Sequence, residues 1–152
     1  MRVRRVPWPM ERRSNKARRD KDSILADTKN LLLILHPAIQ RMPKIERIEG
    51  APQEMKAACY GIIRHFTIAK ECPEVRMEHI RQMLGEWGAL LAAFELCIDY
   101  GLLTDRDKLA IAQQLKRIQE GVRKWRNATR SPNREEQAQV RGDSQEAPAS
   151  DE

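Results

Sequence analysis

The stretch that decides the fold is DRDKLAIAQQLKRIQEGVRKWRN, residues 105–127. Its apolar side chains recur in alternating steps of four and three, at Ile111, Leu115, Ile118, Val122 and Trp125. Because an α-helix turns once every 3.6 residues, this spacing keeps the side chains on one face. The stretch therefore predicts an amphipathic helix that must bury this face against other elements.

Three segments upstream repeat the same spacing. The first carries it at Ile24, Leu25, Thr28, Leu31, Leu32, Leu35 and Ile39. The second carries it at Met55, Cys59, Ile62, Phe66 and Ala69. The third carries it at Ile80, Leu84, Trp87, Leu91, Phe94 and Ile98. Four helices joined by short connections can bury these faces only against one another, so we expect an all-α protein, an antiparallel up-down-up-down four-helix bundle over residues 22–127.

Caps and prolines set the expected limits of the first helix. Asp22 or Ser23 can begin it, because either side chain can accept a hydrogen bond from a free backbone N–H. Pro37 should end the helix near Leu35 or kink it, and the continuing apolar face favours a kink. Residues 37–52 can hold an irregular or short helical piece before the second helix.

Turn residues separate the later helices. The residue before a proline avoids helical angles, so Cys72 should end the second helix and Pro73 should open the third. Gly101 should end the third helix, and Thr104 should cap the fourth, which we expect to run from Asp105 to about Asn127. The glycines beside Trp87, Gly85 and Gly88, suggest a close approach between helices.

Charge is unevenly distributed along the chain, whose net charge is +6. Residues 1–22 carry +6, residues 23–127 carry +3 and residues 128–152 carry −3. Residues 1–21 and 128–152 lack helical periodicity, so we expect a disordered basic extension and a disordered acidic tail. A cationic extension is typical of polyanion binding, although a solvated extension that aids solubility has the same composition.

Membrane and secretory segments are not expected. No window of 18 residues is uninterruptedly apolar, and no apolar run follows the N-terminal arginines. The three cysteines, Cys59, Cys72 and Cys97, are an odd number, and two lie among apolar neighbours. We therefore expect reduced cysteines and a cytoplasmic protein.

Catalytic and metal-binding patterns are also missing from the sequence. It has no glycine-rich phosphate loop, no pair of C-x-x-C motifs and no H-E-x-x-H motif. Cys72 and His79 could approach a metal ion, but a zinc site needs four ligands. His65, beside Phe66, is interpreted as a histidine that is either hydrogen-bonded or on the surface, and Glu86 and Glu95 as members of a solvated face. We expect no enzyme, no cofactor and no metal site.

Basic residues are the main functional candidates. The candidate nucleic-acid-binding residues are Arg12, Arg13, Arg18, Arg19, Arg41, Lys44, Arg47, Lys116, Arg117, Arg123, Lys124 and Arg126. Phosphate contacts made by such residues are sequence-independent and weaken with salt. Some of these residues will instead form a solvated face or complement a helix dipole. Trp8 and Trp125 could stack on a base, but the phase of Trp125 favours the core.

Several short motifs resemble a known family. They are the run 42–47 (MPKIER), Trp87, the run 100–104 (YGLLT) and the run 121–125 (GVRKW). They resemble the four-helix-bundle family that includes the accessory variability determinant of diversity-generating retroelements and proteins encoded in intervening sequences of bacterial ribosomal RNA genes. The resemblance covers residues 24–127. The segment 50–52 and the basic extension depart from the family pattern.

The resemblance implies a function. Accessory members of the family form a barrel-like homopentamer with a basic surface, and they bind the retroelement's reverse transcriptase and its template RNA. They support mutagenic complementary-DNA synthesis without catalysing it. Apolar residues off the main face of the last helix, Leu109, Ala110 and Ala112, would suit packing between protomers. The alternative is a helical, oligomeric protein–protein adaptor without a nucleic-acid role.

Overall fold

The chain forms an all-α protein in the computed structural model, which describes the backbone of residues 9–143 and the side chains of residues 23–130. Its elements are α1 (Pro9–Gln40), α2 (Lys44–Ile48), α3 (Ala51–Glu71), the 3-10 turn η1 (Pro73–Val75), α4 (Arg76–Asp99) and α5 (Asp105–Asp143). The described residues contain no strand. The predicted fold class is therefore confirmed.

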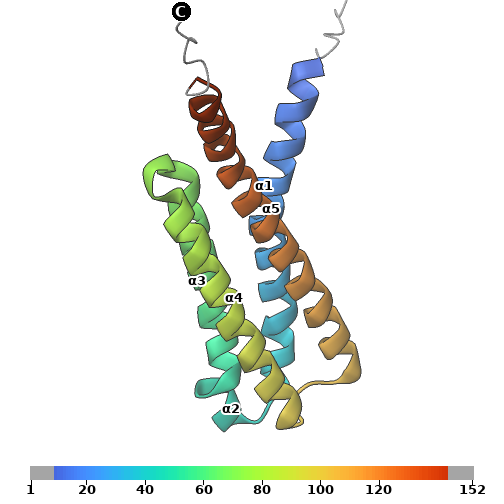
Figure 1. Ribbon diagram of the computed structural model, residues 1–152. Helices are drawn as coiled ribbons and strands as arrows, with labels where there is room; N and C mark the ends of the chain where they lie inside the picture. The colour runs from blue at the N-terminus through green and yellow to red at the C-terminus, as the bar shows by residue number, and fades with distance from the viewer. Residues whose placement is uncertain (1–8, 144–152) are drawn as a thin grey trace, which may run out of the picture.

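The four long helices form two antiparallel pairs (Figure 1). Helix α3 packs along α4, and α1 packs along α5. Further contacts between α4 and α5 and between α1 and α3 join the two pairs. The short helix α2 packs on α3 at the end of the bundle where α1 leads into α3 (Figure 1). This is the antiparallel four-helix bundle that the spacing predicts.

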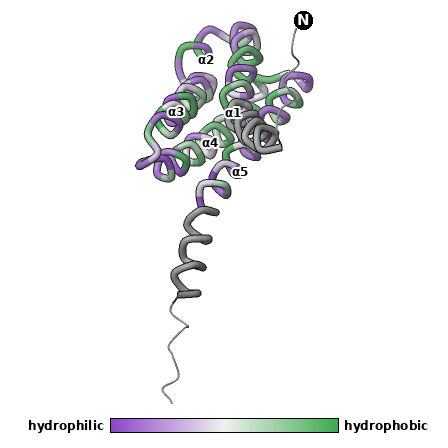
Figure 2. Tube along the Cα trace, turned by 90° about the horizontal axis from the view of Figure 1, so that it is seen from above, coloured by the Kyte–Doolittle hydropathy of each residue, from purple (hydrophilic) through white to green (hydrophobic). Residues whose placement is uncertain are grey.

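The apolar faces meet in one core, which lies between the helices. Every residue of the predicted faces of α3 and α5 is buried. In the view along the bundle, hydrophobic and hydrophilic stretches alternate along each helix (Figure 2). No helix in the described part of the chain is long and apolar enough to cross a membrane.

The buried face of α4 differs from the predicted one. Its buried residues are Ile80, Met83, Leu90, Ala93, Phe94 and Cys97. Four residues of the predicted face are only partly buried: Leu84, Trp87, Leu91 and Ile98. Buried Met83, Leu90 and Cys97 each precede a predicted residue by one position, because α4 is turned so that this side meets α3 and α5. The Trp87 ring lies at its edge, where its Nε1–H donates to the Leu115 carbonyl at 2.8 Å.

Two helix ends also differ from the expected ones. Helix α1 begins at Pro9 rather than at Asp22 or Ser23, and α5 continues to Asp143 rather than ending near Asn127. A helix that packing has already nucleated needs only adequate propensity to extend, not a further apolar face. Residues 1–8 and 144–152, which we expect to be disordered, lie outside the described residues. The expected disorder of residues 9–21 and 128–143, which are helical here, stays a prediction for the free chain.

The connections follow the predicted turn residues. Helix α1 continues through Pro37, and α2 is the short helical piece expected within residues 37–52. Helix α3 ends before Cys72, and Gly101 has a φ of 68° after α4. Thr104 caps α5, since its Oγ1 accepts a hydrogen bond from the Asp107 N–H at 3.2 Å.

Close helix approaches occur at other glycines than the predicted pair. A Cβ added at Gly85 or Gly88 would meet nothing within 4 Å, so the expected close approach is wrong for these two. At Gly121 an added Cβ would lie 3.0 Å from Cγ1 of the fully buried Ile24. At Gly61 it would lie 2.5 Å from the carboxyl carbon of Glu86. At these two positions a side chain of a neighbouring helix packs directly against the glycine backbone.

All three cysteines are free, as the sequence predicts. Cys59 and Cys97 are buried, and Cys72 is partly exposed. Burial raises the pKa of the Cys59 thiol to about 12. Burial, followed by the nearby Glu46 charge, raises the pKa of the Cys97 thiol to about 11. Both buried thiols therefore stay protonated and unreactive at neutral pH.

Candidate nucleic-acid interface

Three cations of α5 are exposed: Lys116 and Arg123 on its outer side, and Lys124 on the side toward α1. None of them makes a hydrogen bond or ion pair with another residue between 23 and 130. The amphipathic pattern places them there, because they fall between the buried positions of the stripe. Lys116 and Arg123 are seven residues apart and share a face, about 10 Å from each other along the axis. The one acid between them, Glu120, is also exposed.

Arg117 faces α1 instead. It lines a pocket of about 150 Å³ between the two helices, together with Asp27 and Lys124. Desolvation raises the pKa of the Asp27 carboxyl, and the positive charge of Arg117 opposes that effect. The Arg117 charge therefore already compensates a carboxylate, and it is less available to a phosphate than the charges of the outer side.

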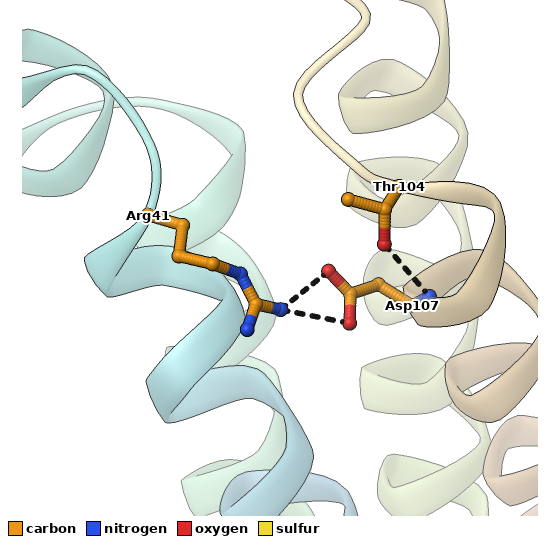
Figure 3. Close-up of polar contacts among 3 residues, drawn as sticks. All are labelled: Arg41, Thr104 and Asp107. Carbon is orange, nitrogen blue, oxygen red and sulfur yellow. Dashed lines mark hydrogen bonds and ion pairs between the residues drawn. The ribbon is translucent and has the colours of Figure 1, made fainter.

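Arg41 is held at the opposite end of the bundle. One of its terminal nitrogens, Nη2, donates to Asp107 Oδ1 at 2.9 Å and to Oδ2 at 2.7 Å. Thr104 fixes the backbone of Asp107 through the cap of α5 (Figure 3). The Arg41 side chain is 58% exposed, so the pair contributes at most about 1 kcal/mol to stability. Its role is to tie the end of α1 to the start of α5.

The remaining predicted cations are scattered. Lys44 is exposed on α2, whereas Arg47 and Arg126 are half-buried, each with an Nε that has no hydrogen-bond partner among the described residues. The side chains of Arg12, Arg13, Arg18 and Arg19, on the N-terminal part of α1, lie outside the described ones. Asp107 and Arg123 are sixteen residues apart on α5, about 24 Å along the helix. The predicted residues therefore do not form one site.

Trp125 belongs to the core, as its phase predicts. The side chain is only 4% exposed. Its ring centroid lies 5.5 Å from that of Phe66 on α3. The guanidinium carbon of Arg76, on α4, lies 5.9 Å from the Trp125 ring centroid. Arg76 also donates from Nε to the Ala69 carbonyl at 2.8 Å, which satisfies the end of α3. In this position Trp125 joins α5 to the α3–α4 pair and is not available to stack on a base.

The two histidines at the α3–α4 hairpin make a contact that was not predicted. Nδ1 of His65 lies 2.9 Å from Nδ1 of His79. The signal in the sequence is symmetry, since each histidine is seven residues from Cys72, where the chain turns. Within the part of the chain that the structure describes, no three His, Cys, Asp or Glu side chains gather where they could hold a metal ion.

A groove of about 530 Å³ runs between α1 and α5 next to the Arg41–Asp107 pair. Its apolar lining includes Ile34, Pro37 and Ala110, and also Leu33, which is 73% exposed.

Comparison of the chain with protein-family models, with curated proteins and with solved structures found no match.

Proposed function

We propose that the protein is a non-catalytic nucleic-acid-binding accessory subunit of a retroelement reverse transcriptase, which supports mutagenic complementary-DNA synthesis from a template RNA. The observation that carries the nucleic-acid part is the set of exposed cations of α5 that have no hydrogen bond or ion pair among the described side chains: Lys116, Arg123 and Lys124. The polymerase part rests on the family resemblance of residues 24–127.

Electrostatics gives the proposal its physical content. An exposed lysine or arginine without a carboxylate partner has no ion pair to break when it binds a phosphate, so the free-energy cost of binding is small. Its binding also releases counterions condensed on the nucleic acid. Contacts of this kind read the backbone rather than the bases, so binding should be weakly dependent on sequence. In a homo-oligomer, which the resemblance implies to be a pentamer, the same face would be repeated, and avidity would raise the affinity for a long RNA.

The test is a matched pair of triple variants. One replaces Lys116, Arg123 and Lys124 with glutamine. The control replaces three exposed cations of other faces, Lys29, Arg81 and Arg106, and so loses the same charge. Affinity for a labelled, structured RNA is measured by fluorescence anisotropy from low to moderate salt.

Each lost phosphate contact should lower the salt slope by about 1, so the α5 variant should lose about 2–3 and the control less than about 1. A further variant without residues 1–21 reports on the basic extension. The proposal fails if the α5 variant and the truncated protein both bind RNA with the parent's affinity and salt slope. A reverse-transcriptase gene beside the coding gene, with paired template and variable repeats, would support the polymerase part.

The second candidate is an oligomeric protein–protein adaptor without a nucleic-acid role. The groove between α1 and α5 favours it, because Leu33 in its lining is 73% exposed, and Leu109 elsewhere on α5 is 63% exposed. Sedimentation equilibrium together with the RNA titration separates the two candidates. Self-association with no salt-dependent RNA binding supports the adaptor. A monomer at micromolar concentration removes the oligomeric part of both.

A further inference from the structure

The two facing histidines of the α3–α4 hairpin share one hydrogen bond. The Nδ1 atoms of His65 and His79 are 2.9 Å apart, and the ring centroids are 5.2 Å apart. A hydrogen bond of this length needs one Nδ1 to carry a proton and the other to offer its lone pair. The contact therefore forms only while at least one of the two rings is neutral.

Protonation of both rings removes the contact. When both rings are imidazolium, both Nδ1 atoms are donors and neither can accept. Two positive charges would then stand at hydrogen-bond distance, in a place that is partly shielded from water. Their repulsion and the loss of the hydrogen bond both favour separation of the rings.

The carboxylate of Glu86 lies close enough to act on the charge of His65. Glu86 of α4 leans against Gly61, one turn before His65, where any Cβ would collide with its carboxyl group. The charged groups that act on His65 are His79 and Glu86 from α4 and Arg64 from its own helix. Glu86 is the only one of these three that stabilises a protonated His65.

We propose that the His65–His79 contact is a pH-sensitive link between α3 and α4, which is closed while the pair shares a proton and opens when a second proton binds, with His65 then pairing with Glu86. The inference concerns the α3–α4 face rather than the outer side of α5, so it does not depend on the proposed function.

The direction of the pH effect follows from His65. Desolvation, then the His79 and Arg64 charges, lower the pKa of His65, and Glu86 opposes them. A lowered pKa in the folded state means that folding favours the neutral ring. The contribution to stability is therefore complete above the ordinary histidine pKa of 6.5 and is lost as the pH falls below it.

The first experiment is a histidine titration by nuclear magnetic resonance. The reference is the same protein unfolded in urea. We expect the pair to titrate in two steps, with the His65 midpoint in the folded protein below its midpoint in the unfolded protein. In the His79→Asn variant, the His65 midpoint should rise toward that of the unfolded protein. A His65 midpoint equal to that of the unfolded protein, or an unchanged His65 midpoint in the variant, overturns the proposal.

The second experiment measures thermal unfolding at pH 7.5 and pH 5.0. The parent and the His36→Asn control should lose the same number of degrees between the two pH values. His79→Asn should lose fewer degrees, and Glu86→Gln should lose more because the charge opposite the protonated ring is gone. Equal losses in all four proteins overturn the proposal. If a variant does not fold, the titration of the parent alone decides.

Discussion

Replacing Trp125 with alanine should weaken the joint between α5 and the α3–α4 pair. The ring is 4% exposed, packs on Phe66 with centroids 5.5 Å apart and lies 5.9 Å from the Arg76 guanidinium. Alanine keeps helix propensity high, so the change tests packing rather than helix formation. The variant removes the largest side chain of the α5 face and leaves a cavity between three helices.

The burial of the ring sets the magnitude. A buried aromatic side chain removes about 150–250 Å² from water, which at about 25 cal/mol per Å² corresponds to about 4–6 kcal/mol. Because the unfolded chain already buries some of this area, that range is an upper one, and Trp→Ala substitutions in cores cost about 3–5 kcal/mol. Against a total of about 5–15 kcal/mol, the loss is a large share of the stability.

The assay is thermal and urea unfolding followed by circular dichroism at 222 nm. One kcal/mol shifts the melting temperature of a domain of this size by roughly 4 °C, so Trp125→Ala should melt at least about 10 °C lower. Trp125→Phe, which keeps a ring against Phe66, should lose less than half as much. If Trp125→Ala melts within about 2 °C of the parent and loses only RNA affinity, the ring stacks on bases and the packing argument is wrong.

Two further predictions concern glycines and thiols. Gly85→Ala should stabilise the protein by about 0.5–1 kcal/mol, because its Cβ meets open space. Gly121→Ala should destabilise it by about 1 kcal/mol, because the added Cβ presses on buried Ile24. Urea unfolding that ranks the two variants in the opposite order contradicts the prediction. Cys72 should react with a thiol reagent in the native protein, and Cys59, whose pKa burial raises to about 12, only in urea; equal native rates would contradict its burial.

Local spacing was enough to predict the helices and most of their buried faces. The stripe from Ile111 to Trp125 and the stripe from Met55 to Ala69 are buried residue for residue. The turn at Cys72 and the end at Gly101 were also predictable. The reason is that each of these features depends on residues within a few positions of one another, through helix periodicity, proline sterics or the conformational freedom of glycine.

Features between helices were decided by the tertiary structure. The sequence could show that Gly61, Gly85 and Gly121 lie in helices, but not that only the first and last of these meet a neighbour. It could not pair His65 with His79, nor shift the buried face of α4 toward Met83 and Leu90. Which side chains share a helix face is a local property, whereas which helix meets that face, and at what height, is set by the packing of all four helices together.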